Sequence, residues 1–351
     1  MHCRHCKSQR LISGQRGAAL IFAMLVFALA TALVVAMKGE FERFYQRTGN
    51  ILLDGQSQAY LRGAEDLAGI LLLTDYDSDK RAGVWRDDLN EIWWTKPGNP
   101  PPTYGLDGEG WMSGSLEDLQ GRFNLNALAK TVSGDRTSDV KKRFTSAQEQ
   151  FIRLLQALGN PAVSQQEAIT ITESISDWLD TDREPLLDGA EDDYYYGQTP
   201  GYRAANRNMS SVSELRAVAN ITPEIYRALL PWITVWPKEA VKLNIHTAPA
   251  MVLRSINAKG DLSPLTEAEG ASLVEYREET GFEDKTDFQA NPVFDGKRDD
   301  MTEILALLGE NSDYFLLEAQ VEVAGRSTRL YSVINRSDRN IATIARASGS
   351  L

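Results

Sequence analysis

A run of twenty residues without a single charge, Ala18–Met37, constrains this chain more than any other stretch. A helix of that length is about 30 Å long, which matches the hydrocarbon core of a bilayer. No other part of the chain is comparably apolar. The sequence therefore predicts one membrane-spanning helix near the amino terminus, and the residues on either side of it decide what kind of protein carries it.

The short segment in front of the apolar run is basic. Residues 1–17 contain Arg4, Lys7, Arg10 and Arg16 and no acidic residue. Basic flanks stay on the cytoplasmic side of a membrane. We therefore expect the helix to have its amino end in the cytoplasm and to leave the bulk of the chain on the other side.

Three interpretations of the apolar run compete. An ordinary secretory signal has a shorter apolar region and a small-residue cleavage site, whereas this run is followed by Lys38 and Glu40. A plain membrane anchor also fits. The third interpretation rests on the segment Gln15–Ala18, which resembles the site of the type IV prepilin peptidase, cut after its glycine. The apolar run starts immediately after Gly17, which favours this interpretation and predicts Ala18 as the new amino terminus.

Phe22 marks a departure from most pilins and pseudopilins, which carry a glutamate five residues into the mature chain. A carboxylate inside a bilayer is costly unless it is paired. In those proteins its partner is the terminal amine of the neighbouring subunit, and a chain with phenylalanine at this position cannot form that pair. One type of pseudopilin is known to lack the glutamate.

The charge balance disfavours nucleic acid as a partner. The chain of 351 residues has a formal net charge of −12, and removal of a leader that carries four basic residues would change this to −16. An acidic surface repels phosphates. A chain of this length also has room for about two domains beyond the membrane helix.

Cys3 and Cys6 are the only cysteines in the sequence, and with His2 and His5 they have the spacing of a zinc-ligand cluster. The cluster has no second half and lies in the segment that we expect to be removed, so we expect no zinc site. The mature chain would then contain no thiol and form no disulfide in an oxidising compartment.

Helix and strand signals divide the rest of the chain into segments. An apolar stripe at three- and four-residue steps continues the membrane helix to about residue 72, although a separate soluble helix after a short linker would give the same stripe. Alternating residues around a turn at Ala324–Gly325 predict a terminal β-hairpin. We expect these segments: a leader (1–17), a membrane helix (18–37), its continuation with the first strands (38–125), an inserted helical calcium-binding domain (126–236), a second helical segment (237–311) and the terminal hairpin (312–345).

The strongest chemical feature is the acidic run Asp177–Asp193, which holds eight carboxylates and one arginine within seventeen residues. Carboxylates packed so closely repel one another, and calcium, a hard cation with oxygen ligands, resolves that conflict and tolerates irregular loops. Aromatic residues on both sides, Trp178 and Tyr194, indicate an ordered loop. We therefore predict a site for one or two calcium ions with these ligands: Asp180, Asp182, Glu191 and Asp192 at its core, joined by Glu184, Asp188 and Asp193.

Two other interpretations of the acidic run remain open. Runs of charge are most often solvated loops, and paired carboxylates can hydrolyse glycosidic bonds. We expect no enzyme, because His246 is the only histidine outside the leader and stands before a predicted helix cap. The alternating Asp75, Asp77 and Asp79 resemble the start of a calcium loop, but the glycine and glutamate of an EF-hand are absent, so we expect a solvated loop there.

The segment Leu243–Phe288 resembles the helix-hairpin-helix modules that grip the backbone of DNA. Such modules need a glycine-rich hairpin whose amides face phosphate, whereas the hairpin here, Asn257–Pro264, has one glycine and lies among acidic residues. A membrane-anchored DNA-binding protein is therefore the alternative function. The segment also echoes an earlier one, Phe123–Asn126 against Leu243–His246, which predicts a weak internal repeat.

Several strings in the mature sequence, taken in their order, resemble one family. They are GSLEDLQGRFNLNAL, SDWLDTD, GAEDDYY, YRAANRNMSSVSELR and LNIHTAP, and they accompany the Gly17/Ala18 junction and the missing glutamate at Phe22. In this combination the chain is identified as a member of the K-type minor pseudopilins of the type II secretion system. The match covers nearly the whole chain.

The resemblance implies a pilin-like fold of the α+β class, in which a long amino-terminal helix packs on a small antiparallel sheet and a large all-α domain is inserted. It implies calcium in the inserted domain, which the acidic run indicates independently. It further implies a non-enzymatic, single-pass protein of the bacterial inner membrane, with the bulk of the chain in the periplasm.

The same resemblance implies a place and a set of partners. Such a protein sits at the tip of a short pseudopilus, in complex with the I- and J-type minor pseudopilins, and initiates or caps assembly for protein export across the outer membrane. The major pseudopilin and the inner-membrane components of the secretion system would be further partners. The prepilin peptidase would cleave and methylate the chain.

Overall fold

The computed structural model describes most of the chain, in the ranges 16–96, 98–106, 110–130 and 140–349. Cys3 and Cys6 lie outside these ranges, as do the other leader residues up to Gln15. The chain divides into two compact units, residues 1–58 and residues 59–351.

A single helix, α1 (Arg16–Ala82), contributes to both units. Within the first unit its large apolar side chains are exposed, among them Phe22 and Phe27. In the described part of the chain, α1 is the one helix that is long and apolar enough to cross a membrane. The predicted Gly17/Ala18 junction lies in its first turn.

The carboxyl end of α1 differs from the prediction. The helix extends past residue 72, through Thr74–Asp79, and ends at Ala82. It ends where Gly83 adopts a φ of +70°, the left-handed conformation that commonly terminates helices. The expectation of a solvated loop at Thr74–Asp79 is wrong, because these residues are helical and Asp75 is buried.

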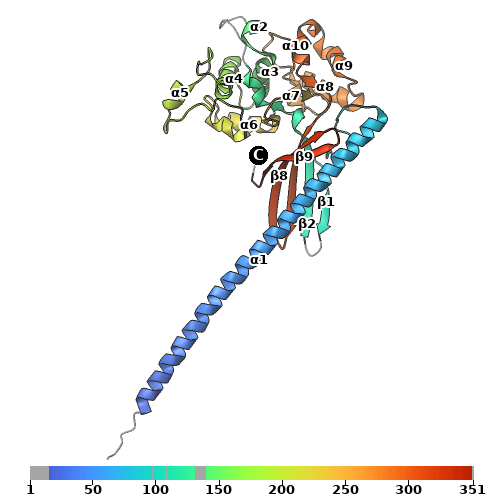
Figure 1. The fold of residues 1–351 in the computed structure, drawn as a ribbon. Coiled ribbons are helices and arrows are strands. Elements are labelled where there is room, and N and C mark those ends of the chain that lie inside the picture. Colours follow the sequence, from blue (N-terminus) through green and yellow to red (C-terminus); the bar gives the residue numbers. More distant parts are fainter. Residues whose placement is uncertain (1–15, 97, 107–109, 131–139, 350–351) are drawn as a thin grey trace, which may run out of the picture. The chain divides into compact units, whose positions relative to one another are not determined.

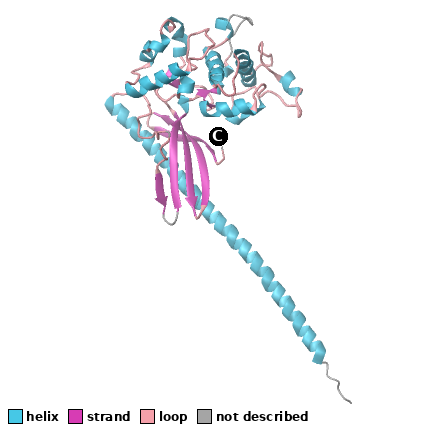
Figure 2. Ribbon diagram, turned by 180° about the vertical axis from the view of Figure 1, so that it is seen from behind, coloured by secondary structure: helices cyan, strands magenta, loops and turns pink. Residues whose placement is uncertain are grey.

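In the second unit, one face of α1 packs against an antiparallel sheet (Figure 2). The residues on this face recur at helical spacing and are buried: Leu61, Ala64, Ala68 and Leu72. Glu65 on the same face pairs with Arg346 of the sheet at 2.8 Å. Only the second half of the predicted apolar stripe therefore marks the contact with the sheet, because in its first half Phe41, Phe44 and Ile51 are exposed.

Five antiparallel strands form the sheet in the order β1-β2-β7-β8-β9. Their bounds are Thr103–Leu106 (β1), Gly110–Asp118 (β2), Tyr314–Val323 (β7), Arg326–Ser337 (β8) and Asn340–Ala347 (β9). Strands from distant parts of the sequence therefore lie side by side, with Gly110 opposite Val323 (Figure 1). A long helix on an antiparallel sheet is the predicted pilin-like fold of the α+β class.

The carboxyl-terminal segment forms three strands, so the prediction of a hairpin alone is incomplete. The predicted turn at Ala324–Gly325 joins β7 and β8, and both turn residues have positive φ, +51° and +74°, as the tight turns of hairpins require. The third strand, β9, was missed because its residues alternate only between exposed and half-buried positions.

The residues between β2 and β7 form an insertion whose regular structure is mainly helical (Figure 1). It includes both predicted helical segments, 126–236 and 237–311. Its α-helices are α2 (Val140–Arg143), α3 (Ser146–Ala157), α4 (Gln165–Leu179), α5 (Asp192–Tyr196), α6 (Pro223–Leu229), α7 (Ala250–Leu253), α8 (Glu267–Glu279), α9 (Lys285–Ala290) and α10 (Thr302–Leu305). Its 3₁₀ helices are η1 (Leu119–Gly121), η2 (Leu125–Ala129), η3 (Val212–Ala217), η4 (Leu230–Trp232), η5 (Pro292–Phe294) and η6 (Arg298–Met301).

Two apolar cores hold the insertion together. The first contains Phe151 and the apolar side chains of α3 and α4, and the second contains Phe288 and the apolar side chains of α7 and α8. The longer helices α3, α4 and α8 begin at capping boxes, and the box of α8 is the predicted pair of Thr266 and Glu269. These boxes satisfy backbone amides that the first turn of a helix leaves without a partner.

The predicted internal repeat is confirmed in the backbone pairing. Two short parallel strand pairs occur, β3 (Phe123–Asn124) with β4 (Ile233–Thr234) and β5 (Leu243–Asn244) with β6 (Leu308–Gly309). In each pair the first strand ends in an asparagine whose Oδ1 accepts a hydrogen bond from the amide two residues later, at 2.9 Å in both cases. The two halves of the insertion therefore start with the same local structure.

Candidate functional site

The acidic run forms a compact group of three carboxylates. Asp180 caps the carboxyl end of α4, Glu191 caps the amino end of α5, and Asp182 lies in the loop between them. Each offers an oxygen within 4.8 Å of the others. A hydrogen bond within the group stabilises the turn that carries it: the amide of Asp182 donates to Oδ1 of Asp180 at 3.2 Å.

Within the described ranges, none of the three carboxylates forms an ion pair, although Arg183 follows Asp182 in the chain. Burial, reinforced by the neighbouring carboxylates, raises the pKa of Asp180 to about 6 and that of Glu191 to about 7. Glu191 is 4% exposed, and its Oε1 receives no hydrogen bond from any residue that the structure describes. A buried carboxylate oxygen without a donor fits a cation ligand, so the donor set suits calcium.

The other predicted ligands lie outside this group. Asp188 is paired with a basic residue instead: Arg143 donates to its Oδ2 at 2.6 Å and also to Glu173 at 2.8 Å. Oδ1 of Asp192 accepts from the amide of Ala204 at 3.2 Å. Two more predicted ligands have exposed side chains: Glu184 and Asp193.

Asn206 lies beside Asp182 and was not among the predicted ligands. Its Nδ2 donates to the carbonyl oxygen of Asp182 at 2.6 Å, and its amide donates to the carbonyl oxygen of Trp178 at 3.0 Å. Its Oδ1 is buried and has no partner within the described ranges. A neutral asparagine adds no charge to an acidic run, so composition gives no signal for it.

Asp177 and Gly189 shape the loop behind the carboxylates. Burial raises the pKa of Asp177 to about 8, and its carboxylate accepts from the amide of Leu186 at 3.1 Å. A Cβ atom on Gly189 would lie 2.0 Å from Oδ2 of Asp177. The loop therefore needs glycine at this position for steric reasons.

A second group of charges lies at the carboxyl end of α1. Arg336 of β8 pairs with Asp75 at 3.1 Å and, through a short contact, with Asp87. All three residues are at most 5% exposed. Asp75 also forms a hydrogen bond with Glu91, whose pKa burial and the nearby Asp87 raise to about 10. The raised pKa favours the neutral form of Glu91, which lowers the repulsion in the group.

A third polar group joins the sheet to the insertion. Asp118, at the end of β2, is 3% exposed, and burial raises its pKa to about 6. Its Oδ2 accepts from the hydroxyls of Thr247 and Ser312, and its Oδ1 accepts from the amide of Gln120 at 2.7 Å. Asp118 therefore connects β2 with segments far from it in the sequence.

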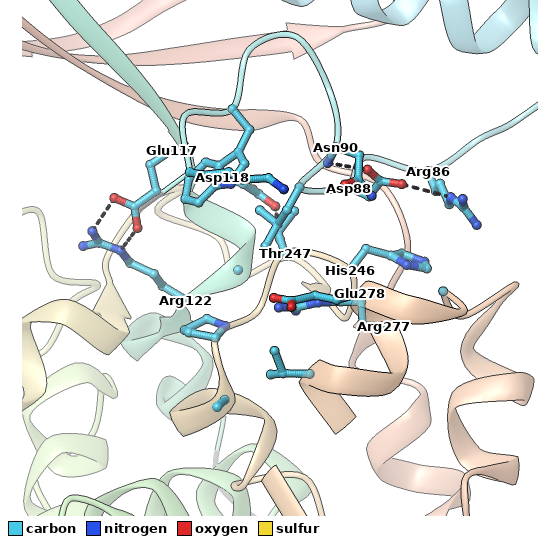
Figure 3. Close-up of a pocket in the computed structure, with 18 of the residues that line it drawn as sticks. Arg86, Asp88, Asn90, Glu117, Asp118, Arg122, His246, Thr247, Arg277 and Glu278 are labelled. Carbon is cyan, nitrogen blue, oxygen red and sulfur yellow. Dashed lines mark hydrogen bonds and ion pairs between the residues drawn. The ribbon is translucent and has the colours of Figure 1, made fainter. Parts of the chain in front are cut away.

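A cavity of about 920 Å³ lies beside this third group. Figure 3 shows Arg122 facing Glu117 on one side of it and Arg86 beside Asp88 on the other. The Arg122–Glu117 pair is bidentate, at 2.7 and 2.6 Å. These pairs neutralise charged side chains on opposite walls of the cavity.

His246 lies on the same cavity, but its surroundings are those of a packed side chain. Its side chain is 2% exposed, and burial, followed by the charge of Arg86, lowers its pKa to about 4. Its ring lies 6.5 Å from the ring of Phe282. The lowered pKa makes His246 a weak base, which disfavours a role as a general base.

In the hairpin Asn257–Pro264, which resembles that of a DNA-binding module, the groups that could contact a phosphate already have partners. The amide of Gly260 donates to both carboxylate oxygens of Glu149 at 3.1 Å. Lys259 donates to the carbonyl oxygen of Phe144 at 2.7 Å and pairs with Glu149 at 3.5 Å. A phosphate would have to displace a buried carboxylate, which argues against this alternative.

Comparisons with known proteins agree on one family. A family model described as type II secretion system protein K matches residues 121–238, and a second with the same description matches residues 243–307. The type II secretion system protein K of Klebsiella pneumoniae is 30% identical over 339 residues, covering 95% of this chain and 97% of that protein. The protein of the same name from Pseudomonas aeruginosa is 31% identical over 346 residues, covering 96% and 93%.

A solved structure gives the same result. The crystal structure of the GspK–GspI–GspJ complex from the type 2 secretion system of enterotoxigenic Escherichia coli contains a chain that matches with a TM-score of 0.71. The two chains are 25% identical, and the match covers 87% of this chain and 100% of the other.

A long helix on an antiparallel sheet, with a helical insertion between β2 and β7, defines a pilin-like protein with an apolar amino-terminal helix. The matches along nearly the whole chain identify the particular group. The chain belongs to the type II secretion system protein K family, a family of structural pseudopilins.

Proposed function

We propose that this chain is a non-enzymatic minor pseudopilin at the tip of the type II secretion pseudopilus. There it forms a complex with the I- and J-type minor pseudopilins and initiates or caps assembly for export across the outer membrane. The observation that carries the proposal is the likeness, over 87% of this chain, to a structure described as a complex of GspK with GspI and GspJ. The major pseudopilin, the inner-membrane components and the prepilin peptidase complete the proposed partners.

Two features support a place at the end of the assembly. Phe22 replaces the glutamate that would pair with the terminal amine of a neighbour, so the contact that places one subunit beneath another is missing. The helical insertion between β2 and β7 comprises far more residues than the sheet. So bulky an insertion would obstruct subunits that lie shoulder to shoulder in a thin filament.

The proposed location follows from the same helix. Residues 18–37 would span the inner membrane once, with the basic leader in the cytoplasm and the remainder in the periplasm. The exposed apolar side chains of α1 in the first unit support this placement, because in water they would form an unusually large apolar surface.

Sedimentation of the full-length chain in detergent tests the proposed complex. The chain alone should be monomeric, because its lateral and upward contacts are blocked, and it should form one defined species when I- and J-type minor pseudopilins are added. Mixtures of the chain with the I-type protein alone, and with the J-type protein alone, provide the control. Filaments formed by this chain alone, or the absence of any mixed species, would contradict the proposal.

Cleavage between Gly17 and Ala18 is the second expected result. This prediction rests on the basic leader, which ends where the apolar run begins. Mass spectrometry of protein extracted from membranes should give a chain that starts at Ala18 and carries an amino-terminal methyl group. Substitution of Gly17 by leucine should leave the leader attached, and a wild-type chain that still begins at Met1 would refute the prediction.

We also propose that the group of Asp180, Asp182 and Glu191 binds calcium in the insertion. Its donor set supports this, because three carboxylates converge and Oε1 of Glu191 lacks a hydrogen bond among the described residues. Asn206 would add a neutral oxygen. The bound ion would neutralise the repulsion between the end of α4 and the start of α5 and so order the loop between them.

A further inference from the structure

The segment 84–94 follows α1 and connects the end of that helix with the insertion. The amide of Asp87 donates to the carbonyl oxygen of Glu310 at 3.0 Å, and its Oδ2 accepts from the amide of Ser312 at 2.7 Å. Its carbonyl oxygen accepts from Nδ2 of Asn244 at 3.0 Å. Asn244 lies in β5, at the start of the second half of the insertion, and Glu310 follows β6, at its end. The segment therefore binds both ends of that half.

The contact between this segment and α1 needs a hydrogen on a carboxyl group. Glu91 of the segment forms a hydrogen bond with Asp75 of α1. Two ionised carboxylates are both acceptors, so one partner in such a bond must be protonated. Two donors already bind Glu91, since the amide of Asp88 donates to its Oε1 at 3.0 Å and Nε1 of Trp93 donates to its Oε2. Glu91 and Asp75 therefore share one proton between the segment and the helix.

The balance of charges around this pair also favours bound protons. Four carboxyl groups each place an oxygen within 4.8 Å of the others: Asp75, Asp79, Asp87 and Glu91. Within the described ranges, Arg336 is the one basic side chain that pairs with them, at 3.1 Å from Asp75 and through a short contact with Asp87. Asp75 and Asp87 are at most 4% exposed. Like charges so close together and so little hydrated disfavour full ionisation.

The other charged groups around the site do not supply the missing positive charge. Asp313 and Asp338 add negative charge beside Arg336 and Asp87. The neighbouring basic side chains have other partners: Lys80 lies over the ring of Tyr76, Arg81 donates to the carbonyl oxygen of Asp77, Arg86 pairs with Asp88 (Figure 3), and Arg339 pairs with Asp77.

We propose that the shared proton of Asp75 and Glu91 forms a pH-sensitive latch between the end of α1 and the insertion. With the proton bound, the pair holds segment 84–94 against the helix. Loss of the proton leaves two carboxylates in contact, and their repulsion separates the segment from the helix. This inference goes beyond the proposed function, because it uses no contact with another protein.

The direction of the pH effect follows from the surroundings of the carboxyl groups. Burial, followed by the charge of Asp87, raises the pKa of Glu91 to about 10. Burial, followed by the charge of Asp75, raises the pKa of Asp79 to about 6. A carboxyl group whose pKa is raised in the closed state stabilises that state at low pH, and this contribution is lost as the pH rises through the raised value. The latch should therefore weaken between about pH 6 and pH 10.

Trypsin cleavage after Arg86, followed by mass spectrometry on the full-length chain in detergent, measures the opening of the segment. Asp75→Asn keeps an oxygen for Arg336 and offers Glu91 a permanent N–H donor, so its contact needs no shared proton. The rate for the wild-type chain, divided by the rate for Asp75→Asn at the same pH, should rise at least about tenfold from pH 7 to pH 9. This ratio removes the pH dependence of trypsin itself.

Two further variants make the test specific. Asp77→Asn, on the same turn of α1 but paired with Arg339, should be cleaved like the wild type at each pH. Glu91→Gln removes the other member of the pair and should, like Asp75→Asn, show the weaker pH dependence. A wild-type pH dependence in both Asp75→Asn and Glu91→Gln would overturn the proposal. Protection of the wild-type chain at pH 9 by added calcium, lost in Asp75→Asn, would also overturn it, because the group would then hold a cation in place of the proton.

Discussion

Replacing Arg336 by glutamine should lower the free energy of unfolding of the second unit by about 3–5 kcal/mol. The guanidinium lies between Asp75 and Asp87, and all three groups are buried. Arg336 also donates to the carbonyl oxygen of Ser312 at 2.9 Å. Its removal leaves two buried carboxylates without a counter-charge, which costs more than the loss of a contact.

The loss should be smaller at low pH. Burial raises the pKa of both Asp75 and Asp87 and the positive charge of Arg336 opposes that rise, so the variant should raise both values further. A carboxyl group whose pKa is higher in the folded state favours folding at low pH, and this contribution is lost as pH rises through the folded value. The variant should therefore regain part of its stability as the pH falls below 7.

Denaturant unfolding of the full-length chain, followed by tryptophan fluorescence, measures this effect. The matched control is Arg329→Gln on the same strand, whose pair with Glu318 is exposed and 3.9 Å long. It should cost at most about 1 kcal/mol. Equal losses for the two variants would show that the buried group contributes no more than a surface pair.

Chelation of calcium should produce the second large effect. A ligand that binds only the folded state stabilises it by about 2.7 kcal/mol when its concentration is 100 times its dissociation constant. Without the ion, Asp180, Asp182 and Glu191 repel one another across the loop between α4 and α5. A chelator should therefore lower the melting temperature by several degrees, and added calcium should restore it.

Variants separate a calcium site from a solvated acidic run. Glu191→Gln and Asp180→Asn should abolish the response to calcium, because each removes a charge from the group of three. Asp193→Asn, at an exposed position outside that group, should leave the response intact. A melting temperature that ignores both chelator and calcium would mean that the run is only solvated.

The sequence was informative where structure depends on neighbouring residues. The Thr266–Glu269 capping box, the turn at Ala324–Gly325 and the paired asparagines of the internal repeat all depend on groups within a few positions of one another. The same holds for the second half of the apolar stripe of α1, where the spacing of Ala64 and Ala68 shows the face that meets the sheet. Local hydrogen bonds and periodicity therefore predicted much of the fold.

Contacts between distant residues account for what was missed. The sequence does not reveal that Asp75 is buried, because its partner, Arg336, follows it by 261 positions. Asp188 lies in the acidic run, yet its carboxylate is paired with Arg143, which lies 45 positions earlier. Spacing alone reveals neither pair, since only the folded chain brings these residues together.

The position of this chain in an assembled pseudopilus tests the proposed tip role most directly. Pseudopili that contain the chain with a carboxyl-terminal tag can be sheared from cells, labelled with gold through the tag and viewed by electron microscopy. A subunit that caps or initiates the assembly should place one label at one end of each filament. Labels distributed along the filaments would contradict the tip role, because they would show that the chain is repeated as an ordinary subunit.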